Sequence, residues 1–230
     1  VRKVFFGTGR DADIRAEKIT SQNAPVGSAL VVNQDVQHIV LPFPGRHNVS
    51  NALGAAAAAS VLGVGLTEIA AGLAAFKPCP GRMELLELKG GVVVLEDSYN
   101  ANPLSVRAAL DALHDLGSNG RRVAVLADML ELGPSAPDLH FQIGTLAAER
   151  TDWLFTYGDL AEAIGRGAID AGLPSERVFI TKSHDELVAR LLSIIQDGDR
   201  ILIKGSRGMR MEKITAALRA AKQNTAVNGD

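Results

Sequence analysis

The stretch Arg122-Val-Ala-Val-Leu-Ala-Asp128 decides the fold, and Arg200-Ile-Leu-Ile-Lys204 repeats its pattern near the other end of the chain. Both have an apolar core without polar alternation, which is typical of a strand buried on both faces of a sheet. Apolar residues at helical spacing fill the segments between such strands. Strands that alternate with helices predict a Rossmann-like α/β domain with a mostly parallel sheet covered on both faces.

The alternation extends outward from these two strands over residues 84–222. We expect strands at residues 84–88, 92–95, 122–126, 153–157, 177–180 and 200–203, and helices at 103–116, 138–149, 160–171, 185–195 and 209–222. Little more than Gly90-Gly91 separates the first two strands, so these two are predicted to pair as a hairpin.

The first part of the chain has a different pattern. Its apolar residues predict four short strands, at 3–6, 14–19, 29–32 and 38–43, followed by a helix from His47 and a second over 67–76. Lys77-Pro-Cys-Pro-Gly-Arg82 then combines two prolines with a glycine, which predicts an extended linker that ends the helix. We therefore expect two domains, residues 1–82 and 83–230.

Composition narrows the class of protein. The 230 residues are 47% hydrophobic and 22% charged, which is typical of a globular chain and excludes a disordered or collagen-like one. The 24 basic and 26 acidic residues argue against a nucleic-acid partner. Cys79 is the one cysteine, no signal-peptide pattern opens the chain, and no apolar run reaches roughly 18 residues. These features predict a cytoplasmic protein with no membrane partner.

Several common nucleotide and metal motifs are missing. A P-loop requires a Gly-Lys pair whose lysine neutralises phosphate, and this chain contains none. Gly7-Thr-Gly9 follows an apolar strand but precedes strand-like spacing, so it predicts a turn rather than a dinucleotide-binding loop. The five histidines are scattered without metal-ligand spacing. We therefore expect no metal site in this chain.

Polar clusters follow three strands of the predicted sheet. They are Glu96-Asp97-Ser-Tyr-Asn100, Asp128, and Lys204-Gly-Ser-Arg207. Ligands of open α/β sheets bind beyond the carboxyl ends of the strands, so three clusters at one edge predict a site there. The alternative is that each cluster only keeps a loop in water.

A second candidate segment opens the first helix. Asn48 and Asn51 lie three residues apart, hence on one face of the helix, next to His47. Asparagine amides donate and accept hydrogen bonds at once, as the edge of an adenine requires. Helix capping by Asn48 is the alternative explanation.

Five motifs together are similar to those of one enzyme family. In chain order they are Gly45-x-His47-Asn48-Val49-x-Asn51-Ala-Leu53, Gly81-Arg-Met-Glu84, Asp97-Ser-Tyr-Asn-Ala-Asn-Pro103, Asp128-Met-Leu-Glu-Leu-Gly133 with His140, and Lys204-Gly-Ser-Arg-Gly-Met-Arg-Met-Glu212. From about Gly7 to Glu212 the chain resembles the Mur ligases, although Ala127 stands where the family usually has glycine. The third and fifth motifs resemble the member that adds D-Ala-D-Ala.

The resemblance implies a fold and a reaction. Residues 1–82 would be the C-terminal remnant of the central ATPase domain, with the P-loop, the magnesium ligands and a carbamylated lysine upstream of Val1. The enzyme would phosphorylate the terminal carboxylate of UDP-MurNAc-tripeptide with ATP and Mg²⁺, and the amine of D-Ala-D-Ala would attack the acyl phosphate. We expect a monomer, and we expect the isolated chain to fold without ligating.

The resemblance also assigns roles to residues. It implies catalytic roles for Arg82 and Lys204; cofactor binding by His47, Asn48, Asn51, Arg82, Asp97 and Tyr99; and substrate binding by Asn100, Asn102, Lys204, Ser206 and Arg207. Helix capping is the alternative for Asn102, which precedes a proline. Asp128, Glu131 and His140 are expected to form a loop network that orients the closed enzyme.

Two other functions remain open from the sequence. One is another Mur-like ligase, such as a folylpolyglutamate synthase, which the third and fifth motifs disfavour. The other is a nucleotide-binding or partner-binding module without catalysis.

Overall fold

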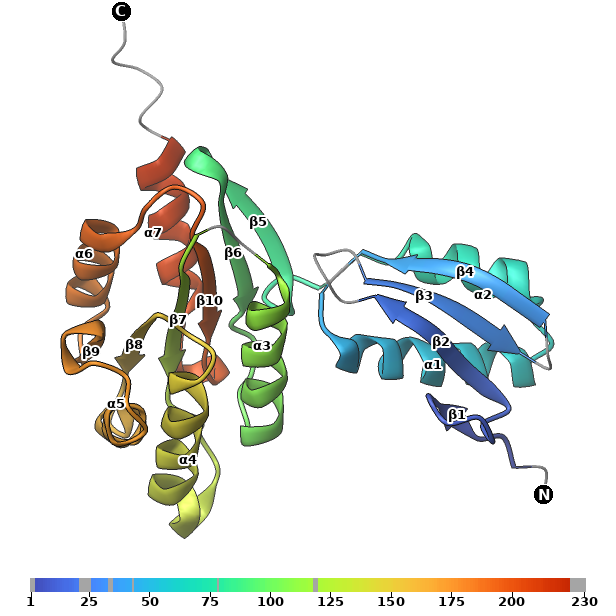
Figure 1. Ribbon diagram of the computed structural model, residues 1–230, viewed down its shortest axis with the longest axis horizontal. Coiled ribbons are helices and arrows are strands. Elements are labelled where there is room, and N and C mark those ends of the chain that lie inside the picture. The colour runs from blue at the N-terminus through green and yellow to red at the C-terminus, as the bar shows by residue number, and fades with distance from the viewer. Residues whose placement is uncertain are drawn as a thin grey trace, which may run out of the picture. The chain divides into compact units, whose positions relative to one another are not determined.

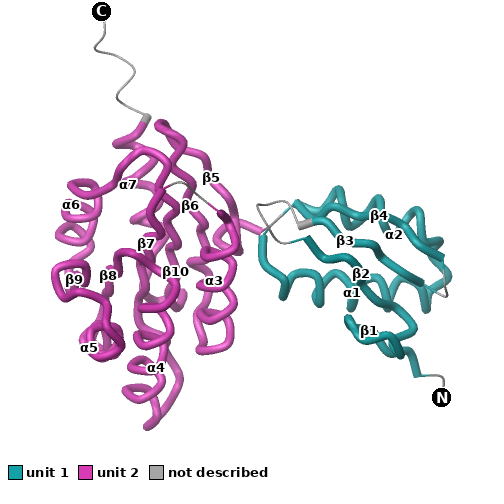
Figure 2. Tube along the Cα trace, viewed as in Figure 1, with its two compact units in different colours: residues 1–78 teal, residues 79–230 magenta. Residues whose placement is uncertain are grey.

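The computed structural model describes residues 3–20, 26–32, 35–42, 44–77, 79–117 and 120–223. Phe43 in a predicted strand and Pro78 in the predicted linker lie outside these ranges. The chain divides into two compact units, residues 1–78 and 79–230 (Figure 2). The last residues of the linker motif therefore group with the second unit, whereas the sequence placed the boundary after Arg82. Within the described ranges, no helix combines the length and apolarity needed to cross a membrane.

The first unit is one sheet with two helices against it (Figure 1). The strands β1 (Phe6–Gly7), β2 (Ile14–Thr20), β3 (Val26–Val32) and β4 (Asp35–Leu41) lie in chain order, with β1 parallel to β2 and the other pairs antiparallel. Alternate strand residues such as Leu30, Ile39 and Leu41 pack against α1 (Arg46–Val61) and α2 (Leu66–Ala74). Burial of this one face forms the core of the unit.

The predicted strands of this unit differ from the observed ones mainly at their ends. Strand 3–6 shortens to Phe6–Gly7, and β3 begins three residues earlier than predicted because Val26, Gly27 and Ser28 extend its pairing with β4. After Gly7 the chain turns and enters β2, not a helix. The prediction of a turn at Gly7-Thr-Gly9 is therefore confirmed.

The second unit contains a six-stranded sheet, which confirms the predicted α/β class. Its strands are β5 (Glu84–Leu88), β6 (Val92–Asp97), β7 (Arg122–Ala127), β8 (Trp153–Tyr157), β9 (Val178–Thr181) and β10 (Arg200–Lys204). Their order is β5-β6-β10-β7-β8-β9, and all pairs are parallel except the β5–β6 hairpin. The last strand thus lies between β6 and β7, a position that hydrophobic periodicity does not predict.

The helices of this unit cover both faces of the sheet. Figure 1 shows α3 (Pro103–Asp115), α4 (Ala136–Ala148) and α5 (Ala161–Asp170) on one face, and α6 (His184–Ile194) and α7 (Glu212–Gln223) on the other. The chain moves outward through β7, β8 and β9, and α6 then returns it to β10. Because crossovers between parallel strands are right-handed, this reversal places α6 on the opposite face.

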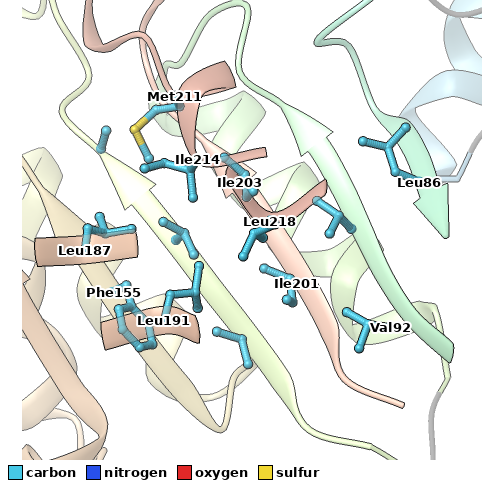
Figure 3. Packing of buried hydrophobic residues seen from close by; sticks show 14 residues of the cluster. Leu86, Val92, Phe155, Leu187, Leu191, Ile201, Ile203, Met211, Ile214 and Leu218 are labelled. Carbon is cyan, nitrogen blue, oxygen red and sulfur yellow. The ribbon is translucent and has the colours of Figure 1, made fainter. Parts of the chain in front are cut away.

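The core beneath α6 and α7 determines which way Lys204 points. Ile201 and Ile203 of β10 pack there with Phe155 and with Leu187, Leu191, Ile214 and Leu218 (Figure 3). Successive strand residues point to opposite faces, so Lys204 lies on the face covered by α3. The end of β10 thus directs a charged group toward the loop that follows β6.

The final helix begins later than predicted. The spacing predicts a helix from residue 209, but Arg207–Met209 form one 3-10 turn and α7 begins at Glu212. Arg210 lies between them with φ of 52°, in the left-handed region that interrupts a right-handed helix. The segment after β10 is therefore a longer loop.

Close packing of α4 on α5 depends on Gly144. A Cβ at this position would collide with the carbonyl oxygen of Ile164 and lie 2.9 Å from Ala168 N. We predict that Gly144→Ala lowers the free energy of unfolding by about 3 kcal/mol, because neither backbone can move freely away. Urea unfolding followed by the fluorescence of Trp153, the single tryptophan, measures this loss.

The matched control is Gly72→Ala in α2, where an added Cβ meets nothing within 4 Å. It should leave the Trp153 transition in place and raise the stability of the first unit by about 0.5–1 kcal/mol. An unchanged unfolding midpoint for Gly144→Ala would contradict the packing argument.

Candidate functional site

The loops that follow β6, β7 and β10 meet at one edge of the sheet. Ser206 joins them: its backbone N–H donates to Asp128 O at 3.1 Å, and its Oγ accepts from Leu130 N at 2.9 Å. The same Oγ lies 3.4 Å from Ala101 O, to which it donates. The three polar clusters predicted to converge do so because β10 lies between the other two strands.

A buried ion pair occupies the centre of this edge. Lys204 Nζ donates to Asp97 Oδ2 at 2.5 Å and to Asn100 O at 2.8 Å. The lysine side chain is only 1% exposed. Burial lowers the pKa of Lys204, the charge of Asp97 opposes this, and the charge of Arg82 adds to it. Removing Asp97 would leave a buried charge without its partner, which is strongly destabilising.

The end of the linker is attached to the same place. Met83 N donates to the second oxygen of Asp97 at 3.3 Å, and Tyr99 N donates to Gly81 O at 3.0 Å. Gly81 has φ of 71°, and a Cβ there would lie 3.0 Å from Ser98 Oγ, so glycine fits where a larger residue would crowd the chain. These bonds hold Arg82 at the edge of the site.

Two arginines contact the ring of one tyrosine at this edge. The Arg82 guanidinium carbon lies 4.1 Å from the centroid of the Tyr99 ring, and that of Arg207 lies 5.7 Å from it. Both arginines are exposed, and Tyr99 is 44% exposed. Within the part of the chain that the structure describes, no ion pair or hydrogen bond is made by either guanidinium.

The two asparagines of the motif bond to nearby backbone. Asn102 Oδ1 accepts from Ser105 N at 2.8 Å and caps α3, with Pro103 as the first helical residue. The capping explanation for Asn102 is therefore confirmed. Asn100 Oδ1 accepts from Ala101 N at 2.8 Å. Both residues are exposed.

The loop after β7 is held by two buried polar residues. Asp128 Oδ2 accepts from Asp159 N at 2.8 Å and its Oδ1 accepts from Leu160 N at 3.1 Å, so the carboxyl group caps the start of α5. His140 Nε2 accepts from Met129 N at 2.9 Å. Its Nδ1 therefore carries the proton and donates to Ala136 O at 2.7 Å.

Of the three residues expected to form a loop network, Asp128 and His140 bond within this loop and its surroundings. Glu131 is exposed and has φ of 64°. Sequence reasoning missed Leu130 and Asp159, because these residues take part through backbone groups that no side-chain pattern reveals.

Burial raises the pKa of the Asp128 carboxyl above 3.8, against the opposing effect of the bonds from Leu160 N and Asp159 N. A raised folded pKa means that the folded state holds this proton more tightly than the unfolded chain. The resulting stabilisation is complete below pH 3.8 and is lost as the pH rises through the folded pKa.

We therefore predict that the wild type loses stability relative to Asp128→Asn as the pH rises above 3.8. Urea unfolding of both proteins across this pH window measures the difference. Asp128→Ala is the control and should be less stable at every pH, because it removes the helix cap. If the free energy of unfolding of the wild type instead rose relative to that of Asp128→Asn with rising pH, the prediction would be wrong.

The first unit carries the other predicted set. Asn51 Nδ2 donates to Asn48 Oδ1 at 3.2 Å, which places both amides on one face of α1, as expected. Asn48 Nδ2 donates to Pro44 O at 2.8 Å, and the helix begins at Arg46 with Gly45 before it. Helix capping by Asn48 is therefore not what the structure shows. Asn51 is exposed, and His47 lies beside this pair in the sequence, half-buried.

No group of three or more His, Cys, Asp or Glu side chains within the described residues is arranged to hold a metal ion. The candidate site of the second unit consists of the Lys204–Asp97 ion pair and the two exposed arginines, Arg82 and Arg207.

Comparison with known proteins identifies the class. The family model for the "Mur ligase, glutamate ligase domain" matches residues 81–207, more than half of the chain and the whole of the edge just described. The chain therefore belongs to the Mur ligase family.

Individual members of the family with similar sequences or structures show which ligases this chain resembles. The chain is 32% identical over 214 residues to the UDP-N-acetylmuramoyl-tripeptide--D-alanyl-D-alanine ligase of Bacillus subtilis, covering 93% of this chain and 46% of that enzyme. It is 38% identical over 182 residues to the enzyme of the same name from Escherichia coli, covering 78% of this chain and 38% of that one. A crystal structure of MurF from Acinetobacter baumannii matches with a TM-score of 0.82 and 33% identity, over 94% of this chain and 46% of that chain. The chain thus spans about half the length of these relatives.

Proposed function

We propose that this chain forms the C-terminal half of an ATP-dependent ligase that joins D-Ala-D-Ala to UDP-MurNAc-tripeptide in peptidoglycan precursor synthesis. The observation that carries the proposal is the gathering of Arg82, Asp97, Tyr99, Lys204 and Arg207 at one sheet edge. Identity to ligases of this name supports the same assignment. A folylpolyglutamate synthase from Mycobacterium tuberculosis shares only the fold, at 19% identity and a TM-score of 0.66.

Nucleotide binding is proposed for four of the motif residues. His47, Asn48 and Asn51 would border the adenine, and Asp97 would accept from the ribose hydroxyls. Each oxygen of Asp97 already accepts one hydrogen bond, and a carboxylate offers about four acceptor positions, so two remain. MurF from Thermotoga maritima has been solved in complex with ADP, and this chain shares its fold.

The chemical step is proposed to run through an acyl phosphate. Transfer of the γ-phosphoryl group to the tripeptide carboxylate develops charge that Arg82 would stabilise, together with Mg²⁺ bound by residues outside this chain. Lys204 uses two of its three donors on Asp97 and Asn100, so it would hold both in place and keep one N–H for the reacting group. Ser206 would act by holding the three loops together.

The dipeptide is proposed to bind next to the phosphate. Its free carboxylate would pair with the fork of Arg207, which matches a carboxylate through two parallel hydrogen bonds. The exposed side-chain amides of Asn100 and Asn102 would contact the bound dipeptide. We place the reaction in the cytoplasm and expect a monomeric enzyme.

The proposal is tested in the full-length ligase by steady-state kinetics with each substrate varied in turn. Arg207→Lys keeps the charge but loses the planar fork, so we expect a higher Michaelis constant for D-Ala-D-Ala, by about 1.5–3 kcal/mol of lost charge-assisted hydrogen bonding, and an unchanged constant for ATP. Arg82→Ala is the matched comparison and should chiefly lower turnover, by about 100-fold. If the Michaelis constant for D-Ala-D-Ala did not change, the assignment of Arg207 to the dipeptide would be wrong, and Arg207 would be assigned to the nucleotide instead.

We further predict that residues 1–230 alone do not release phosphate from ATP in the presence of D-Ala-D-Ala. The reason is that this chain contains no Gly-Lys pair to surround the phosphates. A phosphate-release assay on the purified chain checks this. Release that depends on the dipeptide would contradict it.

A further inference from the structure

The ring of Tyr99 contacts both exposed arginines of the site. The guanidinium carbons of Arg82 and Arg207 lie 4.1 and 5.7 Å from the same ring centroid. The two arginines are 125 residues apart in sequence, one at the end of the linker and one after β10. One aromatic ring thus brings together groups from two distant segments.

The manner of contact leaves the arginines able to bind anions. A guanidinium can contact a ring through its face, and its five N–H donors lie in its plane. An arginine paired with a carboxylate would instead donate hydrogen bonds from those N–H groups to its partner. Neither guanidinium makes a hydrogen bond or ion pair within the described residues, so the N–H edges that recognise phosphate or carboxylate are not used by other side chains.

The two cations also repel each other and the buried ammonium group of Lys204. Asp97 compensates Lys204, since the two form an ion pair at 2.5 Å. No described carboxylate pairs with either guanidinium, so the attraction of the ring opposes their separation, and bound anions would oppose it further.

We propose that Tyr99 is a positioning residue that sets the spacing between Arg82 and Arg207 and so couples two neighbouring anion subsites. This inference rests on the proposed function for the identity of the ligands: a phosphate group on Arg82 and a peptide carboxylate on Arg207. In an acyl-phosphate mechanism these two anions lie on either side of the carbon that the amine attacks. A ring that contacts both arginines would keep the distance between them constant.

The experiment uses residues 1–230 labelled with ¹⁵N-arginine and records the Nε–Hε signals by NMR. We expect the signals of Arg82 and Arg207 to carry the ring-current shift of Tyr99 in the wild type and in Tyr99→Phe, which keeps the ring. Both shifts should be lost in Tyr99→Leu. Arg121 lies 6.0 Å from the ring of Trp153 and serves as an internal control whose signal should not change.

Titration with pyrophosphate and with D-Ala-D-Ala then tests the coupling. Tyr99→Leu should lower the affinity for each probe by about three-fold, the size expected for loss of an exposed cation–π contact. In the wild type, saturation with one probe should change the affinity for the other, and Tyr99→Leu should abolish that change. The Trp153 unfolding midpoint shows that each variant is folded.

Two results would overturn the inference. One is that the Arg82 and Arg207 signals of Tyr99→Leu have the same chemical shifts as in the wild type. The other is that the ring-current shifts are lost while both affinities and their coupling stay the same. If the wild type binds neither probe, the ligand assignment of the proposed function fails, and the arginine signals alone decide whether Tyr99 positions the pair.

Discussion

The buried pair of Lys204 and Asp97 is the interaction on which the second unit depends most. It joins the ends of two adjacent parallel strands, β10 and β6, on the face covered by α3. An ammonium group removed from water is costly unless it is paired and hydrogen-bonded, and here the Asp97 carboxylate and the Asn100 carbonyl accept two of its three N–H donors. The pair therefore constrains where the loops on either side can lie.

Each neighbouring feature is positioned from this pair. The free oxygen of Asp97 receives Met83 N, which brings the linker end to the sheet and Arg82 to Tyr99. Beyond Lys204, the chain passes through Ser206 into the turn that carries Arg207. A substitution at the ion pair would thus disturb both arginines, although it touches neither of them.

Much of this arrangement follows from sequence, and the rest does not for definite reasons. Continuous apolar runs such as residues 122–126 predict buried strands, because a parallel strand has no solvent face. The place of β10 between β6 and β7 is not encoded in any local period, since it depends on which distant edges pair. The late start of α7 depends on the left-handed backbone of Arg210, a residue type that rarely signals a break.

The same division holds for the site. That Asp97, Lys204 and Arg207 lie at one edge could be predicted, because each stands at or just after the end of a predicted strand, whereas their roles came from the resemblance to the Mur ligases. The bonds of Asp97 to Met83 N, of Lys204 to Asn100 O and of Ser206 to Leu130 N could not be predicted, because backbone groups carry no sequence signature. Capping by Asn102 was predictable from the proline that follows it, whereas Asn48 bonds backward to Pro44 O, outside any common cap pattern.

The insertion of β10 between β6 and β7 has a consequence for synthesis of the chain. These two strands cannot pair with each other, since the space between them belongs to a strand that begins at Arg200. While the ribosome is still making residues 128–199, both inner edges stay unpaired and open to wrong partners. The sheet closes only when the segment bearing Lys204 emerges, so a nascent chain exposes two unpaired strand edges until the residues of the candidate site come together.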